Sequence, residues 1–108
     1  MFKTEYKKDL DILLVEKEEY RDFGRSIELG GMVLDMDKED RFLGLEIIDA
    51  SQKLGIDRDE LQKLDGKNVP ESDLEFEMDD EIIRIKITLE IGNQKNVILS
   101  QFSRKASA

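Results

Sequence analysis

The sequence contains no cysteine, no histidine and only one proline. Without cysteine, a disulfide framework, a thiolate metal site and a thiol redox centre are excluded. Without histidine, the usual general base and the usual transition-metal ligand are both missing. We therefore expect no zinc, haem or triad chemistry. The sequence predicts a protein that is not an enzyme and has no cofactor beyond weakly bound Ca²⁺ or Mg²⁺.

Long apolar runs are also missing. No stretch approaches the roughly 18 apolar residues that a membrane-spanning helix needs. The first residues, MFKTEYKKDLD, lack the apolar segment of a secretory signal. These features predict a soluble cytoplasmic protein with no membrane partner. The length of 108 residues predicts one domain over 1–108 with a single modest core.

Charged residues, in contrast, make up 40% of the chain, with 26 acids and 17 bases. The net charge of −9 argues against a nucleic-acid partner, because phosphate binding requires clustered lysine and arginine. The acidity is even, with 14 acids and 9 bases in residues 1–54 and 12 acids and 8 bases in 55–108. It is therefore expected on the folded surface. High charge without cysteine is also typical of thermophilic proteins.

Residues 32–48 have the pattern of a central antiparallel hairpin. With a two-residue turn at Glu39-Asp40, the apolar residues of both strands share one face, as a consistent register requires. The predicted cross-strand pairs are Met36 with Leu43, Leu34 with Leu45, and Met32 with Ile47. Two shorter stretches, 6–16 and 25–29, are also predicted to be strands.

Residues 50–65 are predicted to be helical, as one short helix over 50–54 and a second over 58–65. The predicted N-caps are Asp49 and Asp57, the predicted C-terminal glycines are Gly55 and Gly66, and the predicted buried residues are Leu61 and Leu64.

Residues 74–102 alternate apolar and charged side chains and predict C-terminal antiparallel strands, with frayed residues after them. Turns at Asp79-Asp80 and Gly92-Asn93 would connect these strands. The predicted pairs are Phe76 with Ile83, Leu74 with Ile85, Glu75 with Arg84, and Asp73 with Lys86. The elements together predict an α+β fold. It is a single small domain with an antiparallel, meander-like sheet and one or two short helices on one face.

Asp35, Asp37 and Glu46 are the candidate metal ligands. With Glu39 they follow the carboxylate spacing of a calcium-binding loop, and oxygen ligands suit Ca²⁺. However, Asp40 stands where that loop needs glycine, and its flanks are predicted strands rather than helices. The hairpin register places the three candidates on one face of the sheet instead. The alternative interpretation is an ordinary solvated hairpin with an acidic outer face.

A second acidic cluster covers residues 71–81, with seven acids and no base. It predicts a docking face for a basic protein partner, or a second weak cation site. The alternative is a solvated strand face, neutralised by Arg84 and Lys86. The candidate docking residues are Glu71, Asp73, Glu75, Glu77 and Asp79.

The segments 33–37 and 43–51 resemble a prokaryotic family, domain of unknown function 2283, whose pattern is a hairpin running through Gly-x-Glu-x-x-Asp-Ala-Ser into a helix. The resemblance covers about residues 6–54, with a looser match at Tyr6, Asp9 and 10–15. The turn residue Asp40 departs from the family's glycine. The family has no established activity. The resemblance implies a small antiparallel α+β domain, and some members look like partners of adjacent toxin-like proteins.

The sequence thus predicts a non-enzymatic interaction module that docks a basic partner, with self-association through a sheet edge as a further contact. The alternative is a divalent-cation-binding protein that uses the hairpin carboxylates. A third possibility is an enzyme that uses a pair of carboxylates as acid and base, although nothing in the sequence predicts burial of one of them.

Overall fold

The computed structural model describes residues 1–103. Contacts group the chain into two compact units, Met1–Asn68 and the part from Val69 onward. The described residues form mostly antiparallel sheet, with two α-helices of five residues each. The fold is therefore sheet-rich within the predicted α+β class. A single domain over 1–108 stays a prediction.

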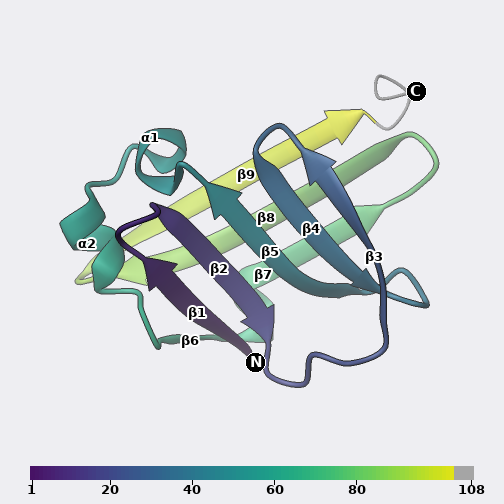
Figure 1. The fold of residues 1–108 in the computed structure, drawn as a ribbon, viewed down its shortest axis with the longest axis horizontal. Helices are drawn as coiled ribbons and strands as arrows, with labels where there is room; N and C mark the ends of the chain where they lie inside the picture. Colours follow the sequence, from purple (N-terminus) through teal and green to yellow (C-terminus); the bar gives the residue numbers. More distant parts are fainter. Residues whose placement is uncertain (104–108) are drawn as a thin grey trace. The chain divides into compact units, whose positions relative to one another are not determined.

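The larger sheet has six strands in the order β3-β4-β5-β2-β1-β6 (Figure 1). Its strands are β1 Phe2–Lys7, β2 Ile12–Lys17, β3 Phe23–Leu29, β4 Met32–Asp37, β5 Phe42–Ile48 and β6 Asn68–Val69. The predicted meander-like order holds for β1-β2 and for β3-β4-β5, but β2 pairs with β5 rather than with β3. The predicted strand over 6–16 is confirmed at 12–16 but is interrupted before that. It consists of the end of β1, a turn that includes Asp11 at φ 54°, and β2.

The hairpin of β4 and β5 confirms part of the predicted register. Met32 pairs with Ile47 and Leu34 with Leu45 as predicted. Met36, however, pairs with Phe42 rather than Leu43, because the register shifts by one residue between Asp35 and Met36. The Asp37 N–H donates to the carbonyl oxygen of Arg41, so the loop consists of the three residues 38–40. The third of them, Asp40, has φ 61°, as expected for a three-residue hairpin loop that ends in a left-handed residue.

The two helices, α1 Ala50–Leu54 and α2 Arg58–Gln62, lie at one end of the six-stranded sheet in the first unit (Figure 1). Asp49 and Asp57 occupy the N-cap positions of α1 and α2, as predicted, but neither makes a side-chain cap bond. The predicted burial of Leu61 and Leu64 is confirmed, as is positive φ at both predicted terminal glycines. Helix α2 ends earlier than predicted, and residues 63–66 form turns. No helix of the described residues is long and apolar enough to cross a membrane.

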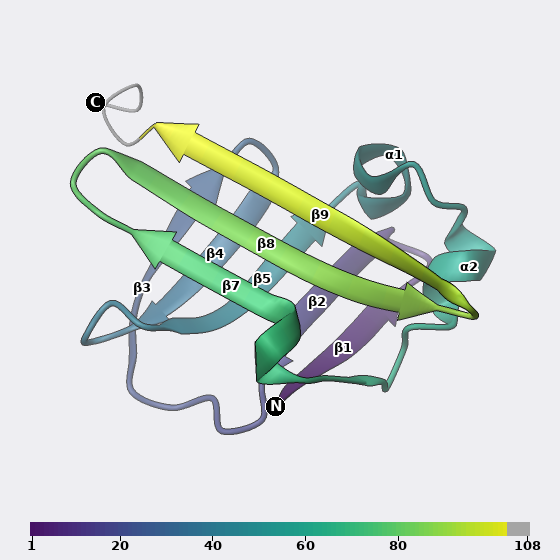
Figure 2. The same cartoon turned by 180° about the vertical axis from the view of Figure 1, so that it is seen from behind.

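The second unit contains the three-stranded sheet β7-β8-β9, a meander (Figure 2). Its elements are the 3₁₀ turn η1 Glu71–Asp73, β7 Leu74–Met78, β8 Ile82–Ile91 and β9 Gln94–Ser103. The turn at Gly92-Asn93 is confirmed, since Ile91 pairs with Gln94. The predicted fraying after residue 102 concerns residues outside the described range, apart from Ser103, which belongs to β9.

The predicted register of β7 and β8 is wrong by two residues. Phe76 pairs with Ile85 and Glu75 with Lys86, because the turn lies one residue further along the chain than predicted. A shift of two residues keeps every side chain on its predicted face, since the side-chain period of a strand is two. The alternate residues Ile83, Ile85, Ile87, Leu89 and Ile91 are therefore all buried, as their spacing predicted.

Candidate interaction surface

The six-stranded sheet has one buried side and one accessible side, which we call the outer face. Two rows of side chains cross the outer face from β1 to β3, with neighbours paired across adjacent strands. The first row is Glu5, Leu14, Glu46, Val33 and Glu28. The second row is Lys3, Glu16, Gly44, Asp35 and Ser26. The outer face thus places acids beside apolar side chains, with two bases, Lys3 and Lys7, at its β1 end.

The loop between β2 and β3 folds onto this face through Tyr20. The Tyr20 hydroxyl donates a hydrogen bond to Asp35 Oδ2 at 2.7 Å, and the Ser26 hydroxyl donates to Asp35 Oδ1 at 2.5 Å. The Tyr20 ring passes over Gly44, where an added Cβ would lie 3.6 Å from Tyr20 Cε2. On its other side the ring stacks on Phe23, with centroids 6.5 Å apart. Both rings remain accessible, Tyr20 at 38% and Phe23 at 47%.

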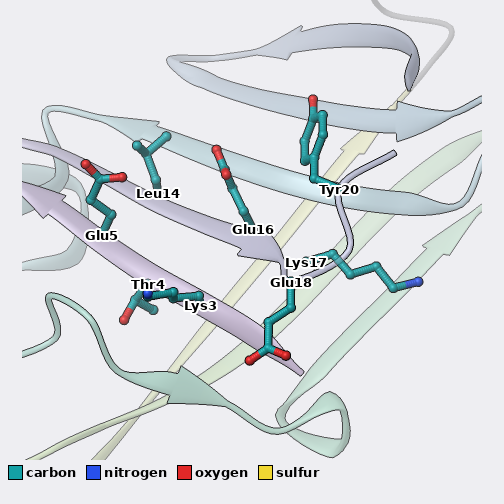
Figure 3. Close-up of a pocket in the computed structure, with 8 residues that line it drawn as sticks. All are labelled: Lys3, Thr4, Glu5, Leu14, Glu16, Lys17, Glu18 and Tyr20. Carbon is teal, nitrogen blue, oxygen red and sulfur yellow. The ribbon is translucent and has the colours of Figure 1, made fainter. Parts of the chain in front are cut away.

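A pocket of about 410 Å³ opens beside Tyr20 on the edge of the outer face (Figure 3). Glu5, Leu14, Glu16 and Tyr20 point to the same side of the strands in this view. Its lining residues are Lys3, Thr4, Glu5, Leu14, Glu16, Lys17, Glu18 and Tyr20. The pocket therefore combines an apolar wall with carboxylates at its rim.

The carboxylates of this pocket are not all neutralised by neighbouring bases. Among residues 1–103, no lysine or arginine forms an ion pair with Glu5 or Glu16. Burial raises the pKa of the Tyr20 hydroxyl, and its hydrogen bond to Asp35 and the charges of Asp35 and Glu16 raise it further. Tyr20 is therefore a neutral hydrogen-bond donor at neutral pH.

The predicted metal ligands Asp35, Asp37 and Glu46 do not gather at one point. The Asp35 carboxylate is bound by Tyr20 and Ser26 on the outer face. Asp37 is buried in the hairpin turn, where Oδ1 accepts the backbone N–H groups of Glu39 and Arg41, each at 2.9 Å. No group of three acidic side chains within residues 1–103 is arranged to hold a metal ion.

The Asp37 carboxylate instead shapes the hairpin turn. Its Oδ2 also lies 2.9 Å from Nε of Arg41. The backbone hydrogen bond from Arg41 lowers the pKa of Asp37 most, and this outweighs the opposite effect of burial, so the pKa stays below its ordinary value. A carboxylate held in this way is a structural hydrogen-bond acceptor of the hairpin turn. The calcium-loop spacing therefore occurs here in a sheet.

The predicted docking residues 71–79 lie in the second unit and have different roles. Glu75 lies 3.7 Å from Lys86 and Glu77 lies 3.5 Å from Arg84, across the β7–β8 ladder. Asp79 accepts the backbone N–H groups of residues 81 and 82 in the turn. Glu71 and Asp73 belong to η1. This face thus pairs part of its acidity internally, in contrast to the outer face of the first unit.

A buried network around Asp11 was not expected from the sequence. Asp11 Oδ1 accepts hydrogen bonds from the Tyr6 hydroxyl at 2.6 Å and from the backbone N–H of Ser51 at 3.0 Å. Its Oδ2 accepts the Ser51 hydroxyl at 2.6 Å and lies 3.9 Å from Nε of Arg58. Asp11 therefore caps α1 from a different part of the chain, and its carboxylate has the capping role that was predicted for the Asp49 side chain. The only local signal was a carboxylate directly before an apolar run.

The network shifts the pKa values of its members in opposite directions. Burial alone would raise the pKa of Asp11, but the hydrogen bonds from Ser51 and Tyr6, together with the Arg58 charge, lower it overall. Burial raises the pKa of Tyr6 most, and the hydrogen bond to Asp11 and the Asp11 charge add to this, giving about 12. At neutral pH the network therefore holds an ionised carboxylate and a neutral phenol.

We expect loss of the Tyr6 hydroxyl proton to make the protein less stable at alkaline pH. Tyr6 keeps its proton to about pH 12 in the folded chain, whereas an unfolded tyrosine loses it near pH 10. This contribution is complete below pH 10 and is lost as the pH rises towards 12. Urea unfolding as a function of pH should show a steeper alkaline decline for the native chain than for Tyr6→Phe.

Tyr20→Phe is the matched variant for this measurement, because the chain contains only two tyrosines and it leaves Tyr6 as the sole phenol to titrate. Its phenolate absorbance should appear together with unfolding, near pH 12 rather than 10. A Tyr6 phenol that titrates freely near pH 10 in the folded chain would contradict the network.

The comparison with protein families concerns the first unit. A family model described as "Protein of unknown function (DUF2283)" matches residues 3–51. This confirms the predicted resemblance, and the matched residues include β1 to β5 with the Tyr20 loop. The family description assigns no activity to this surface.

One curated protein is also similar to the chain. It is from Methanosarcina mazei, carries the description "Putative hypoxanthine phosphoribosyltransferase", and is 25% identical over 73 residues. The match covers 68% of this chain and 55% of that protein, so the chain spans about half of the relative's length. No solved structure matches the chain.

Proposed function

We propose that this protein is a non-enzymatic interaction module whose outer face docks a basic protein segment. The observation that carries the proposal is the pocket beside Tyr20, where Leu14 and the tyrosine ring meet the carboxylates of Glu5 and Glu16. Such a pocket suits a lysine or arginine side chain, because the apolar stem can pack while the charged head reaches a carboxylate. The absence of histidine and cysteine from the sequence supports a binding role.

The rest of the outer face supports the same kind of partner. In the first row, acids alternate with Leu14 and Val33, so apolar contacts are available between charges. A basic segment with interspersed apolar residues would match this pattern. The net charge of −9 would accelerate its approach, and this attraction would weaken as salt rises.

The proposal predicts tight, salt-sensitive binding of a short synthetic peptide that alternates lysine and valine. The variant with Glu5→Gln, Glu16→Gln and Glu46→Gln removes three outer-face charges. We expect it to bind about tenfold more weakly, because three exposed charge pairs together contribute about 1.4 kcal/mol. Isothermal titration at low and high salt measures the change.

The matched control removes three charges from the second unit with Glu71→Gln, Glu75→Gln and Glu77→Gln. The net charge changes by the same amount, so general electrostatic attraction falls equally in both variants. We expect the control to keep its affinity within about twofold. Equal losses in the two variants would mean that the peptide senses only the net charge, and a larger loss in the control would place docking on β7.

A further inference from the structure

The two sheets end on four strands, and three of these carry features that hinder pairing with another strand. Strand β3 has an irregular register between Phe23 and Arg25, and β6 has only two residues. Strand β7 carries Glu75 and Glu77 on its exposed face. Bulges, short edges and charges are the usual means by which proteins protect sheet edges.

The fourth end strand, β9, lacks all three kinds of protection. It extends over ten residues, Gln94–Ser103, with a continuous register against β8. Lys95 is its only charged residue, although 40% of the chain is charged. Val97 and Leu99 are 59% and 64% exposed, the most exposed large apolar side chains of the described strands. Within residues 1–103, β8 is the one strand that pairs with β9.

We propose that β9 pairs antiparallel with β9 of a second copy of this chain, which would join two three-stranded sheets into one of six strands. Two copies that each carry −9 repel one another over most of their surface. Strand β9 contains no acid, so it is an edge along which two copies can approach with little repulsion. Because β9 is nearly neutral, its pairing does not depend on the proposed docking of a basic segment.

The geometry of the β8–β9 hairpin determines which backbone groups of β9 are available. Its turn has two residues, with Gly92 at φ 61° as the first, so the closing pair Ile91 and Gln94 is hydrogen-bonded. Pairs along an antiparallel ladder alternate from there, and the backbone groups of Lys95, Val97 and Leu99 point to the free edge.

A two-fold axis at Ile98 gives a self-complementary register. Ile98 then faces Ile98 of the second copy, and Val97 faces Leu99 on the exposed side of both strands. Lys95 faces Gln101 of the second copy rather than another lysine. The contact therefore covers the two most exposed large apolar side chains of the described strands without opposing like charges, as an isologous two-fold interface requires.

Because the chain has no cysteine, a single introduced thiol can test this register. In Ile98→Cys the two thiols would meet at a non-hydrogen-bonded pair, with Cα atoms about 4.5 Å apart, within the disulfide range. In a dimer of Gln94→Cys with the same register, the two introduced cysteines would lie about 26 Å apart. Under mild oxidation we expect a covalent dimer from Ile98→Cys at least tenfold faster than from Gln94→Cys. Equal rates, or no dimer from either, would overturn the proposal.

Sedimentation of the cysteine-free chain provides a second measurement that does not depend on the introduced thiol. We expect a concentration-dependent dimer that persists or strengthens as salt rises, in contrast to peptide docking. The double variant Val97→Lys and Leu99→Lys should weaken it at least tenfold, whereas Thr88→Lys, one strand further from the edge, should not. A chain that remains monomeric at every concentration, or equal effects of both variants, would contradict pairing through β9.

Discussion

Replacing Asp11 with alanine is expected to destabilise the protein by about 3–5 kcal/mol, the usual cost of removing one partner of a buried charged network. The substitution leaves the Tyr6 hydroxyl and both Ser51 donors without their acceptor. It also places alanine at φ 54°, a backbone conformation that aspartate tolerates better. Urea unfolding at neutral pH measures the loss.

Two further variants separate the causes of this loss. Asp9→Ala removes an exposed acid from the same turn and should change stability by less than about 0.5 kcal/mol. Asp11→Asn keeps one acceptor oxygen and the backbone conformation, so its loss should be smaller than that of Asp11→Ala. If Asp9→Ala and Asp11→Ala proved equally costly, the buried carboxylate would not be the cap of α1.

The pH dependence of the Asp11 variants follows from the direction of its shift. The pKa of Asp11 is lower in the folded chain than in the unfolded chain. Its stabilising contribution is therefore complete above about pH 4, the unfolded value, and is lost as the pH falls through the folded value. Asp11→Asn should accordingly lose less stability than the native chain when both are taken below pH 4.

Replacing Gly24 with alanine is expected to destabilise the protein by about 1–3 kcal/mol, the range for forcing extra atoms into a packed site. A Cβ at this position would lie 2.5 Å from the carbonyl oxygen of Asp37 and 2.9 Å from the backbone nitrogen of Lys38. These are backbone atoms of the hairpin turn, so they can move only with the turn itself. The Lys38 N–H also donates to the carbonyl oxygen of Asp22, and this bond would be disturbed.

Gly44→Ala is the matched control in the same sheet. Its added Cβ would lie 3.3 Å from Glu16 Cγ, a flexible side chain that can move aside. We expect a change below about 1 kcal/mol by urea unfolding. Equal losses of stability in Gly24→Ala and Gly44→Ala would contradict the close approach of β3 to the hairpin turn. They would also contradict the position of Phe23 beside Tyr20.

Face assignments could be predicted from the sequence because they depend only on a local pattern. The alternation in residues 82–91 identifies the buried side of β8 whichever strand pairs with it. The register could not be obtained in the same way, since a shift of two residues gives the same alternation. This is why Phe76 was assigned to the correct face but to the wrong partner.

The candidate site depended on contacts between distant segments, which no local pattern encodes. Asp11 and Ser51 are 40 residues apart and meet because β2 pairs with β5. The Tyr20 loop has no apolar period, so its position over the outer face could not be predicted from a local pattern. The acidic cluster at 71–79 led to the docking prediction because its charges are close together in the sequence. The outer-face acids come from five different strands, and the predicted pairing did not bring them together.

The central claim, that the outer face of the first unit docks a basic segment, is tested most directly by backbone amide chemical shifts during titration with the lysine–valine peptide at low salt. Docking on the outer face should give large shifts at Leu14, Glu16, Tyr20 and Gly44, with little change along β7. Small uniform shifts at all acidic residues would mean counter-ion screening alone. That result, or shifts concentrated on β7 and β8, would contradict the claim.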